Sequence, residues 1–198
     1  MTLPPAVILA GGRASRMGGG DKVLLTLRGQ PLLAHVMARL APQTGAMAIS
    51  ANGDPARFRG FGLPVLPDSL PDFPGPLAGI LAAMDWARDQ GAAQVVVVAG
   101  DTPFLPADLV ARLARAAGPG LALAAAPDAD GMTRLHPACA IWPVALRADL
   151  ARTLADAQGR IRAFAKRHDA RTALFEDATQ AFFNINTPDD LRRAETLP

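Results

Sequence analysis

The amino-acid sequence predicts an α/β fold of three layers, α/β/α, in which helices cover both faces of a mostly parallel sheet. Short apolar runs typical of buried strands alternate with amphipathic stretches typical of helices from Ala6 to about Leu123. Neither an internal repeat nor a long linker interrupts this alternation. The rhythm changes in the last third of the chain, which indicates an antiparallel portion added to the sheet.

The strands of the parallel part are expected at 6–10, 46–51, 63–66, 94–99 and 121–126. The run 94–99 contains four consecutive valines and is typical of a central strand buried on both faces. Pro64 places the run 63–66 at an edge, because proline cannot donate a ladder hydrogen bond. Apolar residues at helical spacing predict helices at about 31–40, 76–88 and from Pro106 onwards. Right-handed connections between the strands then give a Rossmann-like arrangement.

The C-terminal third continues with elements of both kinds. Expected are a strand at 136–142, helices at about 144–157 and 160–168, and closing strands at 171–175 and 182–183. Thr187 and Pro188, followed by two aspartates, predict the start of a last helix.

Length and composition indicate one globular domain, 1–198, because half of the residues are hydrophobic and only 19% are charged. No apolar run approaches the roughly 20 residues that span a bilayer, and the N-terminus lacks the features of a signal peptide. A cytoplasmic protein without membrane contact is therefore expected. The net charge of +2 is too small to indicate nucleic-acid binding. Cys139 is the single cysteine, so we expect a buried, unreactive thiol and no internal disulfide.

A glycine-rich segment, Leu9 to Lys22, follows the first expected strand. Five glycines fall within positions 11–20, where they let backbone N–H groups face a ligand and allow its close approach. Together with Arg13, Arg16 and Lys22, these donors suit a polyphosphate. Lys22 is one of only two lysines among the 20 basic residues, which favours a specific role on phosphate.

Two common phosphate-binding loops do not match this segment. A Walker loop requires Gly-Lys-Ser/Thr, whereas Lys22 lies between Asp21 and Val23. A dinucleotide-binding loop requires G-x-G-x-x-G at the start of a helix, and the spacing after Gly11 and Gly12 is different. The segment is therefore expected to bind phosphate through a different loop.

Two polar residues follow other expected strands, at the edge where open α/β sheets bind ligands. Asn52 ends the run 46–51 and acts either as a turn former or as a nucleotide contact. Asp101 ends the central strand, where burying a lone carboxylate is costly. A bound divalent cation would offset that cost, and the alternative is that Asp101 caps the turn Asp-Thr-Pro.

The segment L-A-G-G-x-x-x-R-M-G-G-x-D-K at 9–22 resembles the nucleotide loop of nucleotidyltransferases. Four later motifs occur in the order typical of molybdenum cofactor guanylyltransferases, which join GMP to molybdopterin. They are P-D-S-L-P-D-F-P-G-P-L-A-G (67–79), G-D-T-P-F-L-P (100–106), H-P-A-C-A (136–140) and F-N-I-N-T-P (183–188). The chain resembles that family over nearly its whole length.

The resemblance implies a set of site residues. GTP would be bound by Leu9, Ala10, Gly11, Gly12, Lys22, Asn52, Asp68 and Asp101. Arg16, Lys22 and Asp101 would be catalytic, and Asp101 would hold Mg²⁺. Molybdopterin would be bound by Asn184 and Asn186, which flank Ile185 and so point to one face of an extended segment. Whether Asp68 contacts the base or the ribose stays open.

The implied reaction is transfer of GMP from GTP to the phosphate of molybdopterin, with release of pyrophosphate. Residues 1–125 would bind the nucleotide and residues 126–198 the acceptor. The resemblance also allows for transient contact with molybdenum-insertion proteins or target apoenzymes. Two alternatives stay open, namely a cytidylyltransferase acting on the same cofactor and a nucleotide-binding module without catalytic activity.

Overall fold

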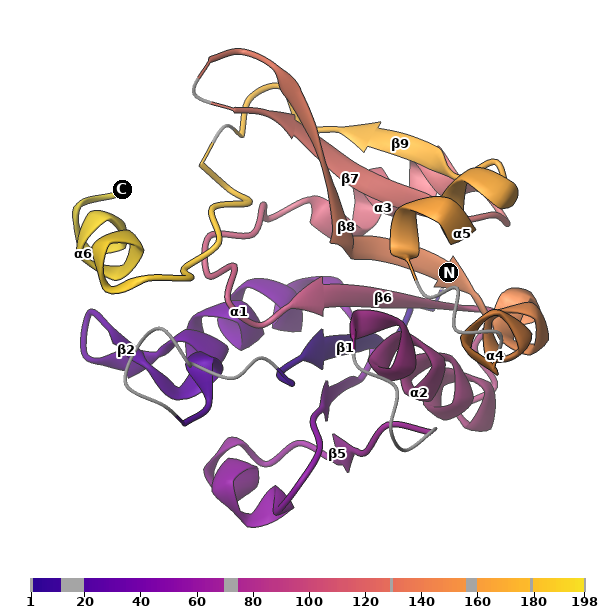
Figure 1. Ribbon diagram of the computed structural model, residues 1–198, viewed down its shortest axis with the longest axis horizontal. Helices are drawn as coiled ribbons and strands as arrows, with labels where there is room; N and C mark the ends of the chain where they lie inside the picture. Colours follow the sequence, from indigo (N-terminus) through magenta and orange to yellow (C-terminus); the bar gives the residue numbers. More distant parts are fainter. Residues whose placement is uncertain are drawn as a thin grey trace.

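The computed structural model describes residues 2–11, 20–69, 75–128, 130–155, 160–178 and 180–197. Within these ranges a seven-stranded sheet runs in the order β5-β4-β1-β6-β8-β7-β9 (Figure 1). Its strands are β1 (Ala6–Leu9), β4 (Met47–Ser50), β5 (Val65–Leu66), β6 (Gln94–Ala99), β7 (Ala122–Pro127), β8 (Thr133–Pro143) and β9 (Arg171–Leu174). The predicted mostly parallel sheet with an antiparallel C-terminal portion is confirmed.

Strand direction in the sheet divides it into two parts. β5, β4, β1 and β6 are parallel, and β5 lies at the edge, as predicted from Pro64. β8 is antiparallel to both β6 and β7, while β9 is parallel to β7. The four valines of β6 are fully buried, in keeping with its central position. Because the first four strands share one direction, their carboxyl ends meet at a single edge.

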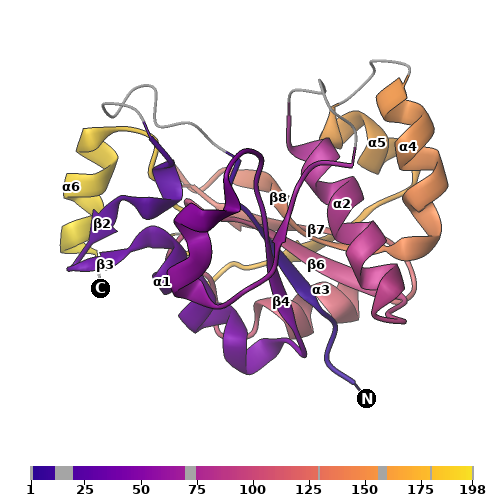
Figure 2. The same ribbon diagram turned by 90° about the horizontal axis from the view of Figure 1, so that it is seen from below.

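Helices cover both faces of the sheet and complete the three layers (Figure 2). One core contains the apolar sides of α1 (Leu32–Leu40) and α3 (Leu109–Ala117). The core on the opposite face is formed with α2 (Pro76–Asp89), α4 (Arg147–Ala155) and α5 (Ile161–Arg167). Each large apolar side chain buried in these cores contributes about 1.5–3 kcal/mol to stability. None of the helices in the described ranges is both long and apolar enough to cross a membrane.

A third, smaller apolar cluster joins residues 27–32 to the C-terminal segment. Leu27 and Leu32 pack there with Ile185 and Ala194. This contact holds α6 (Pro188–Thr196) against the small hairpin of β2 (Thr26–Leu27) and β3 (Gln30–Pro31), as Figure 2 shows. The segment before α6 is thereby placed beside the chain that follows the glycine-rich segment.

Two sequence-based expectations about elements are wrong. The helix expected from Pro106 begins at Leu109, because residues 106–108 form a turn in which the Leu109 N–H donates to the Pro106 carbonyl at 3.2 Å. The strand expected at 182–183 is also a turn, closed by a hydrogen bond of 3.1 Å from the Phe183 N–H to the Gln180 carbonyl. The apolar character of Phe182 reflects burial of its ring and not pairing in the sheet.

Candidate active site

Three predicted site segments lie together at the carboxyl ends of β1, β4 and β6. The Ala10 N–H donates to the Ser50 carbonyl at 2.8 Å, and the Gly100 N–H donates to the Leu9 carbonyl at 3.0 Å. A Cβ on Gly100 would lie 2.6 Å from the Val23 side chain, so only glycine allows this close approach. The short 3₁₀ helix η1 (Lys22–Leu24) is therefore packed directly over the end of β6, which carries Asp101.

The side chains of Lys22, Asp101, Asn184 and Asn186 form one group, here called the lysine cluster. Lys22 Nζ donates to Asp101 Oδ2 at 2.5 Å and to Asn186 Oδ1 at 2.7 Å. Asn184 Nδ2 donates to the other carboxylate oxygen, Asp101 Oδ1, at 3.3 Å. The side chains of Lys22 and Asp101 are each only 14% exposed, so their attraction is weakly screened by solvent. The cluster thus joins residues that are up to 164 positions apart.

The backbone around Ile185 explains why two asparagines reach the same pair of charges. Ile185 is fully buried, and its N–H donates to the Asp101 carbonyl at 3.0 Å. Its neighbours Asn184 and Asn186 are exposed on the opposite side, as the alternation of an extended segment predicts. Asp190 of α6 fixes the end of this segment, because its Oδ2 accepts from the backbone N–H of Asn186 at 2.9 Å. Sequence analysis assigned the asparagines to the acceptor, and the structure places them against Lys22 and Asp101.

A second polar group is formed by Asn52 and Asp68, at the ends of β4 and β5. Asn52 Nδ2 donates to Asp68 Oδ2 at 2.6 Å, and the Asp68 N–H donates to Asn52 Oδ1 at 2.9 Å. The amide and the carboxylate therefore hold each other in one orientation. Both were predicted to contact GTP, and the structure brings them together although 16 positions separate them.

The N-terminus of α2 lies against the same strand ends. A Cβ on Gly79 would lie 2.6 Å from Ser50 Oγ and 2.9 Å from a methyl group of Leu9, so α2 approaches β1 and β4 closely. The helix begins at Pro76 after Gly75, and among the described residues no side chain caps its first turn. The first backbone N–H groups of a helix have no partner within the helix and can donate to a ligand.

Of the remaining predicted residues of the nucleotide loop, the structure describes three and leaves two outside the described ranges. Ala10 is buried and Gly11 is exposed, with open space around the position of an added Cβ. Leu9 is half-buried at the end of β1. Gly12 and Arg16 lie outside the described residues. For these two positions the assignment depends on the sequence alone.

A cavity of about 360 Å³ adjoins the lysine cluster on the side of the C-terminal third. It lies between the β7–β8 hairpin, the segment 180–184 and α6, and Asn184 is part of its wall. His136 stacks on Phe182, with ring centroids 4.6 Å apart and 16° between the planes. Burial lowers the pKa of His136, which favours the neutral imidazole. Arg134 and Arg193 also line this cavity, and Arg134 is paired there with Asp128 at 2.7 Å.

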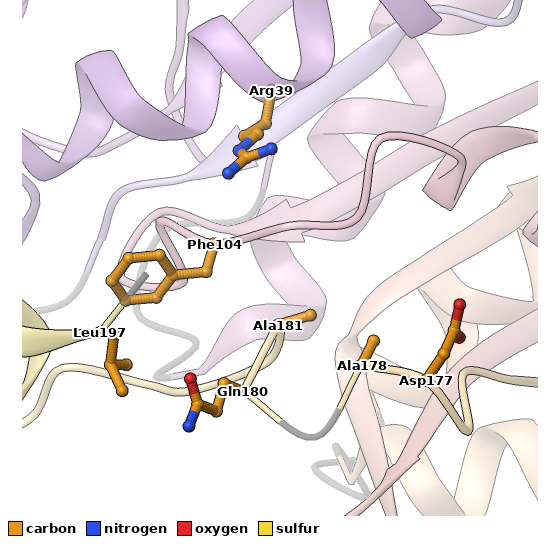
Figure 3. A pocket seen from close by; sticks show the side chains of 7 residues that line it. All are labelled: Arg39, Phe104, Asp177, Ala178, Gln180, Ala181 and Leu197. Carbon is orange, nitrogen blue, oxygen red and sulfur yellow. The ribbon is translucent and has the colours of Figure 1, made fainter.

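A neighbouring hollow of about 300 Å³ lies on the other side of Gln180 and Leu197 (Figure 3). Arg39 of α1 and Phe104, from the turn after β6, also line it. None of the predicted site residues that the structure describes contributes to its wall. The hollow is therefore separate from the lysine cluster and from the Asn52–Asp68 pair.

The described residues contain no ready-made metal site. In this part of the chain no group of three His, Cys, Asp or Glu side chains is arranged to hold a cation. Cys139 is buried, and that burial raises the pKa of its thiol to about 12, as expected for an unreactive cysteine. Asp101 is the acidic residue at the centre of the lysine cluster.

The chain is similar in sequence and in fold to known proteins. Residues 6–172 match the family model of the MobA-like NTP transferase domain. A molybdenum cofactor guanylyltransferase of Cereibacter sphaeroides is 52% identical over 191 residues, which cover 96% of this chain and 95% of that protein. A protein of the same name from Bradyrhizobium sp. is 49% identical over 203 residues, which cover 99% of this chain and 93% of that protein. In fold, the chain is similar to molybdopterin-guanine dinucleotide biosynthesis protein A from Archaeoglobus fulgidus, with a TM-score of 0.71, 23% identity and 96% coverage of each chain.

Proposed function

The chain belongs to the MobA-like NTP transferase family, and on this premise we propose that it transfers GMP from GTP to the phosphate of molybdopterin. The products are pyrophosphate and the molybdopterin guanine dinucleotide. The observation that carries this proposal is the lysine cluster, where Lys22, Asp101 and the two asparagines meet beside the Asn52–Asp68 pair. Relatives named molybdenum cofactor guanylyltransferase cover nearly the whole chain, which supports the choice of nucleotide and acceptor.

The lysine cluster supplies the positive charge that a triphosphate requires. Lys22 has three N–H donors on a flexible stem and can turn from Asp101 toward the β- and γ-phosphates. The backbone of Gly11 and Gly12 and the side chain of Arg16 would contribute further donors there. We therefore assign Lys22 and Arg16 to charge neutralisation on the outer phosphates.

We assign a Mg²⁺ ion to Asp101, whose carboxylate is 14% exposed and follows the central strand β6. Lys22 and Asn184 now hydrogen-bond its two oxygens, so the ion would bind once the triphosphate draws the ammonium group of Lys22 away from the carboxylate. Mg²⁺ in nucleotide sites commonly takes one or two protein carboxylates and completes its shell with water and phosphate oxygens. When bound, the ion would neutralise negative charge on the phosphates during transfer.

The chemistry needs little from the protein beyond positioning. A phosphate oxygen of the acceptor forms a bond to the α-phosphorus of GTP, and the bond from that phosphorus to the bridging oxygen of the β-phosphate breaks. The acceptor oxygen is already ionised, so no general base is required. The role of the chain's own residues is to hold the two substrates in line and to stabilise charge on the leaving pyrophosphate.

The Asn52–Asp68 pair and the start of α2 form the proposed guanosine end of the site. A carboxylate such as Asp68 can accept hydrogen bonds from N1–H and N2–H₂ of guanine, or from ribose hydroxyls. The uncapped N–H groups at the start of α2 can donate to the guanine O6. These complementary groups support selection of guanine over bases with a different pattern of donors.

The aromatic cavity supports the assignment of residues 126–198 to the acceptor. Its stacked His136 and Phe182 offer a flat surface to a ring system, and Arg193 offers charge to an anion, whereas Arg134 is paired with Asp128. Asn184 connects the cavity to Asp101, where the acceptor phosphate must arrive. A cytoplasmic location, and contacts with molybdenum-insertion proteins or target apoenzymes, stay predictions from the sequence.

One assay tests the whole proposal. The purified protein is incubated with molybdopterin and Mg²⁺, and GTP, CTP, ATP or UTP is supplied in parallel. We expect pyrophosphate release and dinucleotide formation with GTP alone. Preferential turnover of CTP would identify a cytidylyltransferase instead. Nucleotide binding with no turnover in any reaction would favour a binding module.

A further inference from the structure

Arg57 lies between the two polar groups of the site and was not singled out by sequence analysis. It belongs to the 3₁₀ helix η3 (Pro55–Phe61), which follows Asn52. Its Nε lies 2.6 Å from Oδ2 of Asp21, the residue directly before Lys22. Nε is buried and not aligned for a hydrogen bond to this oxygen, so the contact is an ion pair.

The rest of the guanidinium group binds the segment that carries Asn52. One Nη donates to the backbone carbonyl of Asn52 and the other to that of Asp54, each at 2.5 Å. Arg57 therefore links η1, which carries Lys22, to the end of β4, which carries the Asn52–Asp68 pair.

The local structure holds Arg57 in this orientation. Asp54 caps η3 by accepting from the Ala56 N–H at 2.8 Å, and Gly53 adopts the left-handed region with φ of 83°. The guanidinium carbon lies 4.6 Å from the ring centroid of the fully buried Phe58. The side chains of Arg57 and Asp21 are 25% and 24% exposed. The planar fork of an arginine holds an anion and two carbonyls in one fixed geometry, whereas a lysine presents its donors from a single nitrogen on a flexible stem.

We propose that Arg57 is a positioning residue that sets the spacing between the phosphate end and the guanosine end of the nucleotide site. This inference rests on the proposed function, because GTP must bind both ends at once. A ligand that occupies only the phosphate end does not depend on that spacing. Arg57 therefore affects the affinity for GTP much more than the affinity for pyrophosphate.

Calorimetric titration with GTP and with pyrophosphate, each in Mg²⁺ buffer, tests the inference. Arg57→Ala is expected to weaken GTP binding about tenfold or more, the usual effect of losing a charge-assisted contact. Pyrophosphate affinity should change by no more than about threefold, the effect of a partly exposed ion pair. The GTP affinity of Arg57→Lys should lie between that of Arg57→Ala and that of the unmodified protein. Arg59→Ala, an exposed arginine on the same 3₁₀ helix, is the matched control and should bind as the unmodified protein does.

A second variant guards against a general loss of folding. Asp21→Asn keeps the shape of the side chain and removes only the ion pair with Arg57. It should also weaken GTP binding more than pyrophosphate binding, with a thermal midpoint close to that of the unmodified protein. Adding Asp21→Asn to Arg57→Ala should weaken GTP binding little further, because both substitutions break the same Arg57–Asp21 ion pair.

Two results would overturn the inference. One is GTP affinity that is unchanged in Arg57→Ala, and the other is an equal loss for GTP and pyrophosphate. The proposed function fails in a different way, which the same titrations reveal. In that case the unmodified protein itself does not bind GTP, so the two failures are distinguishable.

Discussion

The ammonium group of Lys22 lies 2.5 Å from the carboxylate of Asp101, although 79 positions separate the two residues. Lys22 is the last residue of the glycine-rich segment, and Asp101 follows the central strand β6. A bound triphosphate and its metal ion would compete for both partners of this pair. The consequences of that competition can be measured, and they lead to the first two predictions.

Asp101→Asn should keep the fold and remove most Mg²⁺-dependent turnover. The amide retains the shape and the contact with Asn184 but loses the charge that a divalent cation requires. We expect a loss of at least about 100-fold in kcat, with circular dichroism unchanged. A kcat within a few-fold of that of the unmodified protein would show that Asp101 does not hold the metal ion.

Lys22→Ala should lower transition-state stabilisation by about 2–4 kcal/mol, as loss of one preorganised charge donor does. GTP binding should weaken more than GMP binding, because Lys22 is assigned to the outer phosphates. Lys166, the other lysine of the chain, is exposed on α5, so Lys166→Ala is the matched control. An equal loss for GTP and GMP would place Lys22 nearer the α-phosphate.

The two asparagines of the lysine cluster should be separable by single substitutions. Asn184→Ala should weaken molybdopterin binding and leave GTP affinity nearly unchanged, because Asn184 lines the aromatic cavity. Asn186→Ala should also weaken GTP binding, by about threefold to tenfold, because Asn186 Oδ1 holds the ammonium group of Lys22. Fluorescence titration with each ligand measures both effects. If both variants lose only GTP affinity, the acceptor assignment is wrong.

Asp68→Ala should weaken GTP binding and narrow the preference for GTP over CTP and ATP at the same time. Each hydrogen bond from guanine to a carboxylate contributes about 1.5–3 kcal/mol. Asn52→Ala should also weaken GTP binding, because Asn52 orients Asp68. The double variant should lose less GTP-binding free energy than the sum of the two single losses. If GTP affinity falls while both preferences hold, Asp68 contacts the ribose.

Asp149 should make stability fall in acid. His168 and Arg167 hydrogen-bond its carboxylate, and they lower the pKa of Asp149 from 3.8 to about 2. A carboxyl whose pKa is lower in the folded state stabilises the fold above its unfolded pKa, and this contribution is lost as the pH falls from about 4 to 2. Urea unfolding at pH 5, 4 and 3 measures the free energy of unfolding, which should fall less with decreasing pH in Asp149→Asn than in the unmodified protein. An identical dependence in the variant would assign the effect to other carboxylates.

Much of the fold could be predicted because its signals are local. The four valines of β6 predicted a central strand, and the proline before β5 predicted an edge. The predictions failed where an apolar or proline-rich stretch has a different tertiary role. Phe182 is buried by stacking on His136 and not by strand pairing. Pro106 begins a turn that precedes α3 and not the helix itself.

The sequence by itself determined which residue types are available for the chemistry. Glycines and cations after a buried strand, and an aspartate at the end of another, are local patterns with a direct physical meaning. Only the tertiary structure decided that Asn186 contacts Lys22 and that Arg57 joins Asp21 to Asn52. The physical reason is that these contacts depend on tertiary packing. The apolar cluster around Leu27 and Ile185 fixes the position of α6, and the path of η3 after β4 fixes the position of Arg57. Side chains brought together by such packing leave no periodic signal along the chain.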